Sequence, residues 1–279
     1  MGKQEFGWQT SDNLKIFGQI WQPEKDVRAV IALVHGLGEH CNRYNHLAEF
    51  YNQQGIAVIS FDLRGHGRSE GQRGHAPSYD AIGDDIQHLL DEAAQRFPDK
   101  PIFLYGHSLG GSLVLYFALK RKPAIKGVIA TSPGLETAQP VKGAKLVLGR
   151  IMNAIYPTFS MPNDLDRSGL SRDPEVAKAY NADPLVHGVI SARLGMELLD
   201  NGQYVIAHAA EFPLPLLLMD GSADRLVSPA ASAAFAAKAP KTTTFKMWED
   251  HYHELHNEPD KQSVFDYELG WIDAQLAVK

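Results

Sequence analysis

The sequence predicts an α/β fold with a mostly parallel central sheet flanked by helices. Short apolar runs, of which residues 29–35 and 56–61 are the clearest, fit strands that are covered on both faces. Between these runs, apolar residues recur every three or four positions, which is the spacing of helices packed on a sheet. Strand and helix alternate in this way along most of the chain, and this order is typical of a parallel sheet.

Each element of the first half is predicted where its pattern begins and ends. Residues 15–21 alternate imperfectly with a period of two and stop before Pro23, which predicts an antiparallel edge strand. Helices are expected to end near Gly55 and before Pro98, because these residues do not continue a helix. Buried strands are predicted at residues 29–35, 56–61, 101–105 and 127–130, and helices at residues 44–51, 79–97 and 109–119.

The alternation breaks after Gly134 and resumes after residue 210. The segment 135–210 has helical apolar spacing interrupted by prolines, and no buried-strand pattern. We expect a helical cap here, inserted between the two parts of the core, residues 1–134 and 211–279, because such folds place substrate selectivity in loops at this sheet edge. A helical layer that belongs to the core is the alternative. The resumed alternation predicts strands at residues 214–220 and 242–248 and helices at residues 229–238 and 259–276.

Composition and charge exclude several classes of function. The 279 residues are 44% hydrophobic, which suits a full core, and the net charge of −6 without basic clusters argues against nucleic acid as a partner. Cys41 is the only cysteine, so an intrachain disulfide is impossible and a reducing compartment is the default. No apolar run approaches the roughly 20 residues of a membrane span. We therefore expect a soluble cytoplasmic protein that can lie peripherally on a membrane.

Residues 104–111 combine a strand end, a tight turn and a helix start. They contain the pattern G-x-S-x-G, with Ser108 at its centre. In a strand–turn–helix elbow, Ser108 would have a strained backbone, and Gly106 and Gly110 would remove Cβ atoms that otherwise collide. The serine hydroxyl would then project into an open cleft as a nucleophile. The pattern alone also fits an ordinary Ser/Gly loop, so its context has to decide.

Two later loops offer the partners that a serine nucleophile needs. Asp224 follows the strand 214–220 and could orient a base, while His253 follows the strand 242–248 and could be that base. The order Ser108, Asp224, His253 is the order expected for a triad on this kind of sheet. Asp220 is a less favourable acid because it lies nearer the strand end, and His251 and His256 are alternatives to His253.

Acyl transfer also needs hydrogen-bond donors where negative charge develops on the carbonyl oxygen. The backbone N–H of Leu109, directly after the nucleophile, is one candidate. The backbone N–H of Leu37, in the early glycine-containing loop, is the other.

These motifs together resemble the monoacylglycerol lipases of the α/β-hydrolase superfamily. The resemblance covers nearly the whole chain and includes the cap. It implies an α/β-hydrolase fold in which Ser108 is the nucleophile, Asp224 the orienting acid and His253 the general base and then acid. The residues that carry it are His35-Gly36-Leu37-Gly38-Glu39-His40, Arg43-Tyr44, the run from Asp62 to Gly71, Gly106-His107-Ser108-Leu109-Gly110-Gly111, Leu170-Ser171-Arg172, Tyr180-Asn181-Ala182-Asp183-Pro184-Leu185, the run from Gly221 to Leu226, and Tyr252-His253-Glu254-Leu255-His256.

The resemblance also implies a polar subsite for a glycerol head group. Glu39, Arg43 and His256 are its expected lining, since groups that donate and accept hydrogen bonds beside the base would hold a glycerol leaving group. One departure is visible: the family's usual small pair before Tyr-His is here Asp250-His251, which could recharge the entrance near the base.

The sequence therefore predicts a cofactor-free and metal-free serine esterase that cleaves monoacylglycerols through an acyl-enzyme at Ser108. A lysophospholipase or a general short- to medium-chain carboxylesterase is the alternative activity, and a non-catalytic binding module with this fold is the alternative class. The apolar side chains of the cap could line an acyl tunnel or touch a lipid surface, namely Leu146, Leu148, Ile151, Ile155 and Tyr156.

Overall fold

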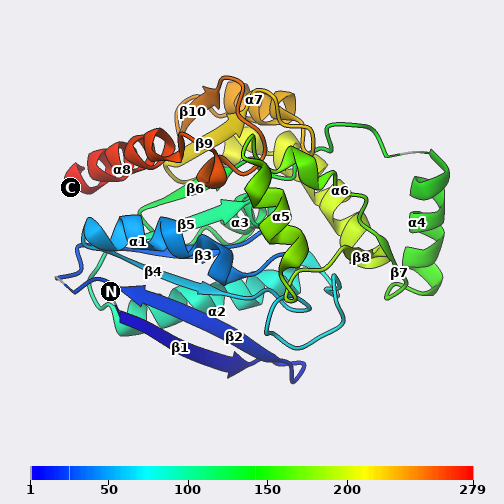
Figure 1. The fold of residues 1–279 in the computed structure, drawn as a ribbon, viewed down its shortest axis with the longest axis horizontal. Coiled ribbons are helices and arrows are strands. Elements are labelled where there is room, and N and C mark those ends of the chain that lie inside the picture. The colour runs from blue at the N-terminus through cyan, green and yellow to red at the C-terminus, as the bar shows by residue number, and fades with distance from the viewer. Residues whose placement is uncertain (1, 25, 142, 279) are drawn as a thin grey trace.

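The computed structural model describes residues 2–24, 26–141 and 143–278 and confirms the predicted α/β fold (Figure 1). Eight strands form one sheet in the order β1-β2-β4-β3-β5-β6-β9-β10. The neighbouring strands from β4 to β10 pair in parallel, whereas the pairs β1–β2 and β2–β4 are antiparallel. The strands are β1 (Gly2–Gln9), β2 (Lys15–Gln22), β3 (Ala29–Val34), β4 (Ile56–Phe61), β5 (Ile102–His107), β6 (Gly127–Thr131), β9 (Leu216–Gly221) and β10 (Thr243–Trp248).

Helices cover both faces of this sheet and divide its core in two. Ile31 of β3 packs in the core beneath α1 and α8, while its neighbour Ala32 packs in the opposite core beneath α2, α3 and α7. Alternate side chains of a strand point to opposite faces, so a strand between two helical layers must be apolar throughout, as β3 and β4 are. The helices are α1 (Asn45–Gln53), α2 (Tyr79–Arg96), α3 (Leu109–Arg121), α7 (Pro229–Lys238) and α8 (Lys261–Ala277), with short 3-10 helices η1 (Cys41–Tyr44) and η4 (Leu255–Asn257).

The prediction that residues 15–21 form the edge strand is wrong, because β1 lies outside β2. Residues 2–9 pair along their whole length with β2, so β2 is the second strand. The mostly exposed side chains of β1 hide its strand character in the sequence. The ring of Phe6 lies over Gly18 of β2, where a Cβ atom would be only 2.4 Å from the ring. This contact explains a glycine within a strand.

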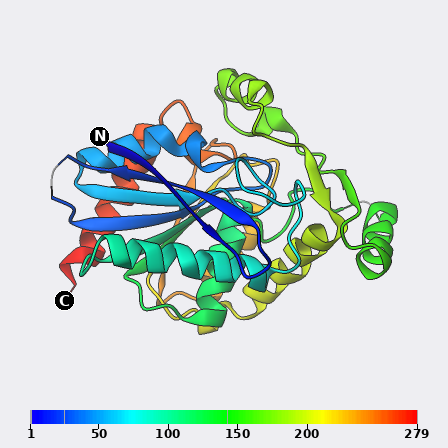
Figure 2. The same cartoon turned by 90° about the horizontal axis from the view of Figure 1, so that it is seen from below.

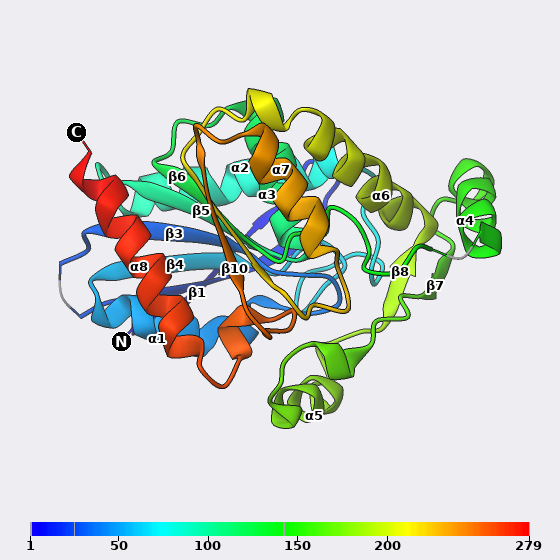
Figure 3. The ribbon, with the colours of Figure 1, turned by 90° about the horizontal axis from the view of Figure 1, so that it is seen from above.

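Between β6 and β9 the chain leaves the sheet and forms mainly helices, as predicted. Two strands of three residues each, β7 and β8, pair there and were not predicted, since three residues are too few for a periodic pattern. Helices α4 and α5 lie near opposite ends of the β7–β8 ribbon (Figures 2 and 3). The elements are α4 (Gly143–Ile155), β7 (Ser160–Pro162), η2 (Arg167–Gly169), α5 (Pro174–Ala182), β8 (Val189–Ser191), α6 (Ala192–Ala207) and η3 (Ala209–Glu211).

The carboxyl ends of the parallel strands meet at one edge of the sheet. The turn after β5 and the loops after β3, β6, β9 and β10 gather there because these strands are neighbours in the sheet order. In the part of the chain that the structure describes, no helix is long and apolar enough to cross a membrane.

Candidate active site

The turn between β5 and α3 holds Ser108 in a strained backbone conformation. Its φ of 55° and ψ of −118° lie where a residue with a side chain is rarely found. A Cβ atom at Gly106 would lie 2.3 Å from the carbonyl oxygen of Gly110, and one at Gly110 would lie 2.1 Å from that of Val34. The close approach of the backbone therefore requires glycine at both positions. The expected strand–turn–helix elbow is present.

Ser108, His253 and Asp224 form one chain of hydrogen bonds. Nε2 of His253 lies 2.9 Å from Oγ of Ser108, and Nδ1 of His253 lies 2.7 Å from Oδ2 of Asp224. With Nδ1 donating to the carboxylate, Nε2 is left to accept the proton of the serine hydroxyl. This is the geometry of a nucleophile, a general base and an orienting acid.

Asp224 is held by main-chain donors as well as by His253. Its Oδ1 accepts hydrogen bonds from the N–H groups of Leu226, at 2.7 Å, and Val227, at 3.1 Å. Burial acts to raise the pKa of Asp224, but the attraction of His253 and these hydrogen bonds outweigh burial and lower it. Burial acts to lower the pKa of His253, and Asp224 outweighs that effect and raises it. The carboxylate is therefore ionised, and the imidazole is a stronger base than usual.

Asp220, the competing acid on β9, has no hydrogen bond to His253 among the described residues. It is fully buried, and burial raises the pKa of Asp220 well above its usual value. A carboxyl group without a hydrogen bond to the imidazole cannot orient it. The geometry thus favours Asp224 over Asp220.

The two other histidines of the loop after β10 do not reach the nucleophile. Nε2 of His251 lies 3.2 Å from a carboxylate oxygen of Asp260, and His251 lines neither cavity at Ser108. His256 is fully buried, with its ring stacked at 4.6 Å on that of Tyr44. Asp250 is exposed and His251 is buried, and neither lines the cavities at Ser108, so the Asp250-His251 pair does not change the cavity wall.

Both predicted oxyanion residues lie at Ser108. A cavity of about 70 Å³ is lined by Leu37 and Leu109 together with the nucleophile. Leu109 is the first residue of α3, where a backbone N–H has no acceptor within the helix. In the other loop, Gly36 directly precedes Leu37, and the N–H of Gly36 donates to Oε1 of Glu39 at 2.6 Å. Two backbone donors on opposite loops can therefore serve one developing oxyanion.

A second, smaller cavity, of about 20 Å³, adjoins Ser108 and His253 and has two carboxylates in its wall. These belong to Glu39 and Glu254, which are both buried. Arg43 joins them: its Nη1 lies 2.5 Å from Oε2 of Glu39 and 2.7 Å from Oε1 of Glu254, and its Nη2 lies 2.8 Å from Oε2 of Glu254. Burial acts to raise the pKa of Glu39, but Arg43 and neighbouring polar groups lower it to about 2.

Only one of the three residues expected to line a head-group subsite lies on a cavity wall. Glu39 does, whereas Arg43 and His256 lie behind the wall. Arg43 is drawn back by two buried carboxylates, and His256 is packed behind the ring of His107, 4.9 Å away. Sequence reasoning missed Glu254, although its place directly after His253 was the signal that could have found it.

The turn after β6 sets the spacing of the nucleophile and the base, and the sequence did not reveal it. The N–H of Ser108 donates to the carbonyl of Thr131 at 3.0 Å, and the carbonyl of Ser108 accepts from the N–H of Gly134 at 2.9 Å. In the same turn, Oγ of Ser132 donates to the carbonyl oxygen of His253 at 2.8 Å. The turn after β6 is thus hydrogen-bonded to the backbone of both Ser108 and His253.

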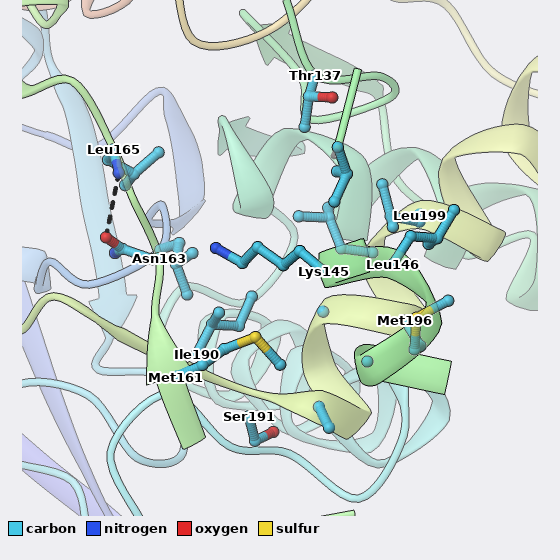
Figure 4. Close-up of a pocket in the computed structure, with 16 residues that line it drawn as sticks. Thr137, Lys145, Leu146, Met161, Asn163, Leu165, Ile190, Ser191, Met196 and Leu199 are labelled. Atoms are coloured by element: carbon cyan, nitrogen blue, oxygen red, sulfur yellow. Dashed lines mark hydrogen bonds between the residues drawn. The ribbon is translucent and has the colours of Figure 1, made fainter. Parts of the chain in front are cut away.

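A larger and mainly apolar cavity, of about 160 Å³, lies between α4, α6 and the β7–β8 ribbon (Figure 4). Leu37, Leu165 and Leu198 line both this cavity and the one at Ser108, so the two adjoin. Lys145 of α4 crosses its edge toward Asn163 in Figure 4, and its Nζ lies 2.5 Å from the carboxylate of Asp164.

The apolar residues of α4 divide into two groups. Leu146 lines the large cavity, as one sequence expectation had it. Four others, together with Tyr156 directly after the helix, are exposed. The exposed fractions are 58% for Val147, 45% for Leu148, 51% for Ile151, 73% for Ile155 and 56% for Tyr156.

Within residues 2–24, 26–141 and 143–278, no group of three or more histidine, cysteine, aspartate or glutamate residues could hold a metal ion.

Comparison with known proteins shows which family model matches this chain and which proteins are similar to it. The model of the family described as "serine aminopeptidase, S33" matches residues 25–260. The monoacylglycerol lipase of Mycolicibacterium smegmatis is 33% identical over 94% of this chain and 94% of its own. The crystal structure of the Paleococcus ferrophilus monoacylglycerol lipase has a TM-score of 0.84 and 33% identity, covering 99% of this chain and 100% of that one. An uncharacterized abhydrolase domain-containing protein of Dictyostelium discoideum is 39% identical over 96% of this chain, but the chain spans only 28% of its length.

Proposed function

The chain belongs to the monoacylglycerol lipase family of the α/β-hydrolases and is a carboxylic ester hydrolase, and we propose from this premise that it cleaves monoacylglycerols to fatty acid and glycerol through an acyl-enzyme at Ser108. The observation that carries the proposal is the position of Ser108 between a mainly apolar cavity, which adjoins the larger apolar one, and a small cavity with the carboxylates of Glu39 and Glu254 in its wall. A monoacylglycerol has the same division, with a long apolar chain and a small polar head on either side of its ester.

In the first half of the reaction, His253 takes the proton of Ser108 as Oγ attacks the ester carbonyl. The N–H groups of Leu37 and Leu109 stabilise the resulting oxyanion, and Asp224 stabilises the imidazolium. When the tetrahedral intermediate collapses, the bond to the glycerol oxygen breaks and His253 gives its proton to that oxygen. Glycerol leaves and the acyl group stays on Ser108.

In the second half, water replaces glycerol and the same groups act in the same order. His253 takes a proton from the water as its oxygen attacks the acyl carbonyl. Collapse of the second intermediate releases the fatty acid, and the proton returns from His253 to Ser108. The chain's own side chains and backbone carry every step.

The small cavity with Glu39 and Glu254 in its wall favours a substrate with an uncharged head group. Among the described residues that line it there is no lysine or arginine, and Arg43 behind it already serves both Glu39 and Glu254. A glycerol hydroxyl can donate a hydrogen bond to Glu39. A phosphate group would instead meet two carboxylates without a free cation, which disfavours a lysophospholipid.

A serine-reactive phosphonate probe tests the nucleophile. We expect one label per molecule in the parent protein and none in Ser108→Ala. Labelling that persists in Ser108→Ala would refute the role of Ser108.

A substrate panel tests the leaving group. We expect monoacylglycerols to be hydrolysed at least about tenfold faster than lysophospholipids of the same chain length, because one repelled charge is worth more than 1.4 kcal/mol at a buried site. Diacylglycerols and p-nitrophenyl esters complete the panel. Faster cleavage of lysophospholipids would favour the alternative activity.

We also propose that residues 135–210 form a cap on a core made of residues 1–134 and 211–279, and that α4 touches lipid surfaces. Support for the contact comes from the outward apolar residues of α4 and from its cationic Arg150, since α4 contains no acidic residue. A cytoplasmic protein that visits a membrane in this way would collect its amphiphilic substrate there.

A further inference from the structure

We propose that Arg43 is a positioning residue that joins the oxyanion loop to the loop of the general base and keeps both in catalytic register. This proposal deepens the function proposed above and rests on it. Arg43 contacts neither Ser108 nor His253 in the structure, so its effect must pass through the two glutamates that it binds.

On the oxyanion side, the connection runs through Glu39. Its Oε2 accepts from Nη1 of Arg43, and its Oε1 accepts from the backbone N–H of Gly36 at 2.6 Å and from the hydroxyl of Tyr44 at 2.7 Å. Gly36 directly precedes Leu37. Glu39 therefore fixes the peptide next to the one that offers the oxyanion donor.

On the base side, the connection runs through Glu254, the residue after His253. Both of its carboxylate oxygens accept from Arg43, and Oε2 also accepts from Nδ2 of Asn257 at 2.7 Å. A bidentate pair fixes orientation as well as distance, because the guanidinium fork matches the carboxylate plane. The backbone of the base loop is thereby held to Arg43.

The surroundings make this connection rigid. The side chain of Arg43 is only 10% exposed, and those of Glu39 and Glu254 are 3% and 2% exposed. Tyr180 of α5 covers the guanidinium, with its ring centroid 4.7 Å from Cζ. Water is thus kept from a cluster of two carboxylates and one cation, where ionic hydrogen bonds are stronger than at the surface.

The functional consequence is a link between two loops that lie far apart in the chain. The oxyanion donor and the base must be placed together, because the oxyanion forms at the same moment as the proton reaches His253. Loss of the link should slow acyl transfer on any ester and leave ground-state binding of the acyl chain nearly unchanged.

Steady-state hydrolysis of p-nitrophenyl butyrate tests the proposal without depending on the natural substrate. We expect Arg43→Met to lower kcat about 10²-fold with a change in KM below about threefold, since a misplaced oxyanion donor costs about that much. Arg43→Lys keeps the positive charge but loses the planar guanidinium that binds a carboxylate through two N–H groups. We therefore expect the kcat of Arg43→Lys to stay below about a tenth of the parent value.

Arg64→Met is the matched control. Arg64 is also buried and binds two carboxylates, those of Asp85 and Asp12, away from the described cavities at Ser108. We expect it to lower thermal stability while kcat of the folded enzyme stays within about twofold, because surrounding packing, not catalysis, depends on it. A folded Arg43→Met enzyme with kcat within about threefold of the parent would overturn the proposal.

Glu254→Gln gives a second test should Arg43→Met not fold. The charge of Glu254 contributes to raising the pKa of His253. In Glu254→Gln we therefore expect the acid limb of the rate profile to move to lower pH, and we expect kcat to fall because the bidentate pair that holds the base loop to Arg43 is lost. A merely structural role would leave both limbs in place, and unchanged limbs with unchanged kcat would contradict the proposal. Failure of Ser108→Ala to abolish turnover would instead overturn the proposed function.

Discussion

Two parts of the segment between β6 and β9 are attached to the molecule in opposite ways. Helix α4 forms an ion pair within the same segment, between Lys145 and Asp164, and its apolar side chains such as Ile151 are exposed. The stretch from η2 through α5 to His187, which we call the η2–α5 stretch, is hydrogen-bonded to the loop of Leu37 and to the loop of His253. In Figure 3 the two helices lie apart, with the β7–β8 ribbon between them.

The bonds of the second stretch go to the backbone on both sides of the nucleophile. The N–H of Glu254 donates to the carbonyl of Leu170 at 2.7 Å, and the N–H of His187 donates to the carbonyl of Gly38 at 2.9 Å. The difference indicates that the η2–α5 stretch helps to hold the two loops of the site in place, whereas α4 has no hydrogen bond to either loop among the described residues.

The largest effect should come from forcing the η2–α5 stretch away from the oxyanion loop. A Cβ atom at Gly38 would lie 2.5 Å from the carbonyl oxygen of His187, and Gly38 has a φ of +80°. We expect Gly38→Ala to lower kcat about 10²-fold and stability by about 1–3 kcal/mol, because the Leu37 donor moves and the backbone is strained. Ester hydrolysis and urea unfolding measure the two effects.

Gly149→Ala in α4 is the contrasting variant. Its Cβ would meet only Sδ of Met196, at an ordinary 3.6 Å, so we expect a gain of about 0.5–1 kcal/mol from helix propensity. Equal losses in both variants would erase the difference between the two regions.

A smaller effect should follow from cutting an ion pair in each region. Glu258 is fully buried, binds Nε of Arg172 at 2.7 Å and accepts from the N–H of Tyr252 at 2.6 Å. Arg172→Met leaves that carboxylate without its cation and loosens the base loop, so we expect kcat/KM to fall about tenfold. Lys145→Met cuts an exposed pair, and we expect a change below about twofold on a soluble ester. A larger loss in Lys145→Met than in Arg172→Met would contradict the comparison.

Next comes an effect confined to lipid surfaces. Ile151→Glu puts a charge on the outward face of α4, so we expect hydrolysis of monoacylglycerol in anionic vesicles to fall about fivefold while hydrolysis of soluble p-nitrophenyl butyrate is unchanged. Ala179→Glu adds the same charge to an exposed position of α5. Vesicle sedimentation should show weaker binding for Ile151→Glu alone, and equal losses in both variants would exclude α4 as the specific contact.

The smallest effect concerns the hydrogen bond between Asp183, directly after α5, and His40 of the oxyanion loop. Oδ2 of Asp183 lies 2.8 Å from Nε2 of His40. Burial acts to raise the pKa of Asp183, but hydrogen bonds from His40 and the N–H of Leu185 lower it overall. Its stabilising contribution is therefore present above the usual aspartate pKa and lost as pH falls through the lowered value. We expect Asp183→Asn to cost about 0.5–1 kcal/mol at pH 7 in urea unfolding. A cost that persisted at pH 2 would rule out the carboxylate charge as its source.

Most of the fold could be predicted from the sequence because its signals are local. The apolar run of β3 and the helical spacing of α2 each reflect an environment that extends over the whole element. β1 escaped prediction because its side chains are mostly exposed, and what defines it is pairing with β2. A strand defined by its partner carries little signal of its own.

The site could be predicted from the sequence to a similar extent. Ser108 could be found because its neighbours Gly106 and Gly110 are required by the turn itself. The position of Arg43 behind the wall could not, because it depends on Glu39 and Glu254, which meet only when distant loops fold together.

The sequence by itself determined the alternation of strands and helices in most of the core, the elbow at Ser108 and the set of acids and histidines from which its partners come, since these follow from local sterics and periodicity. Only the tertiary structure decided that His253 and Asp224 complete the hydrogen-bonded chain, and that α4 and the η2–α5 stretch differ in attachment. The physical reason is that a hydrogen bond depends on tenths of an ångström between loops that are separate in the chain, such as those of Ser108 and His253, and local patterns contain no such distances.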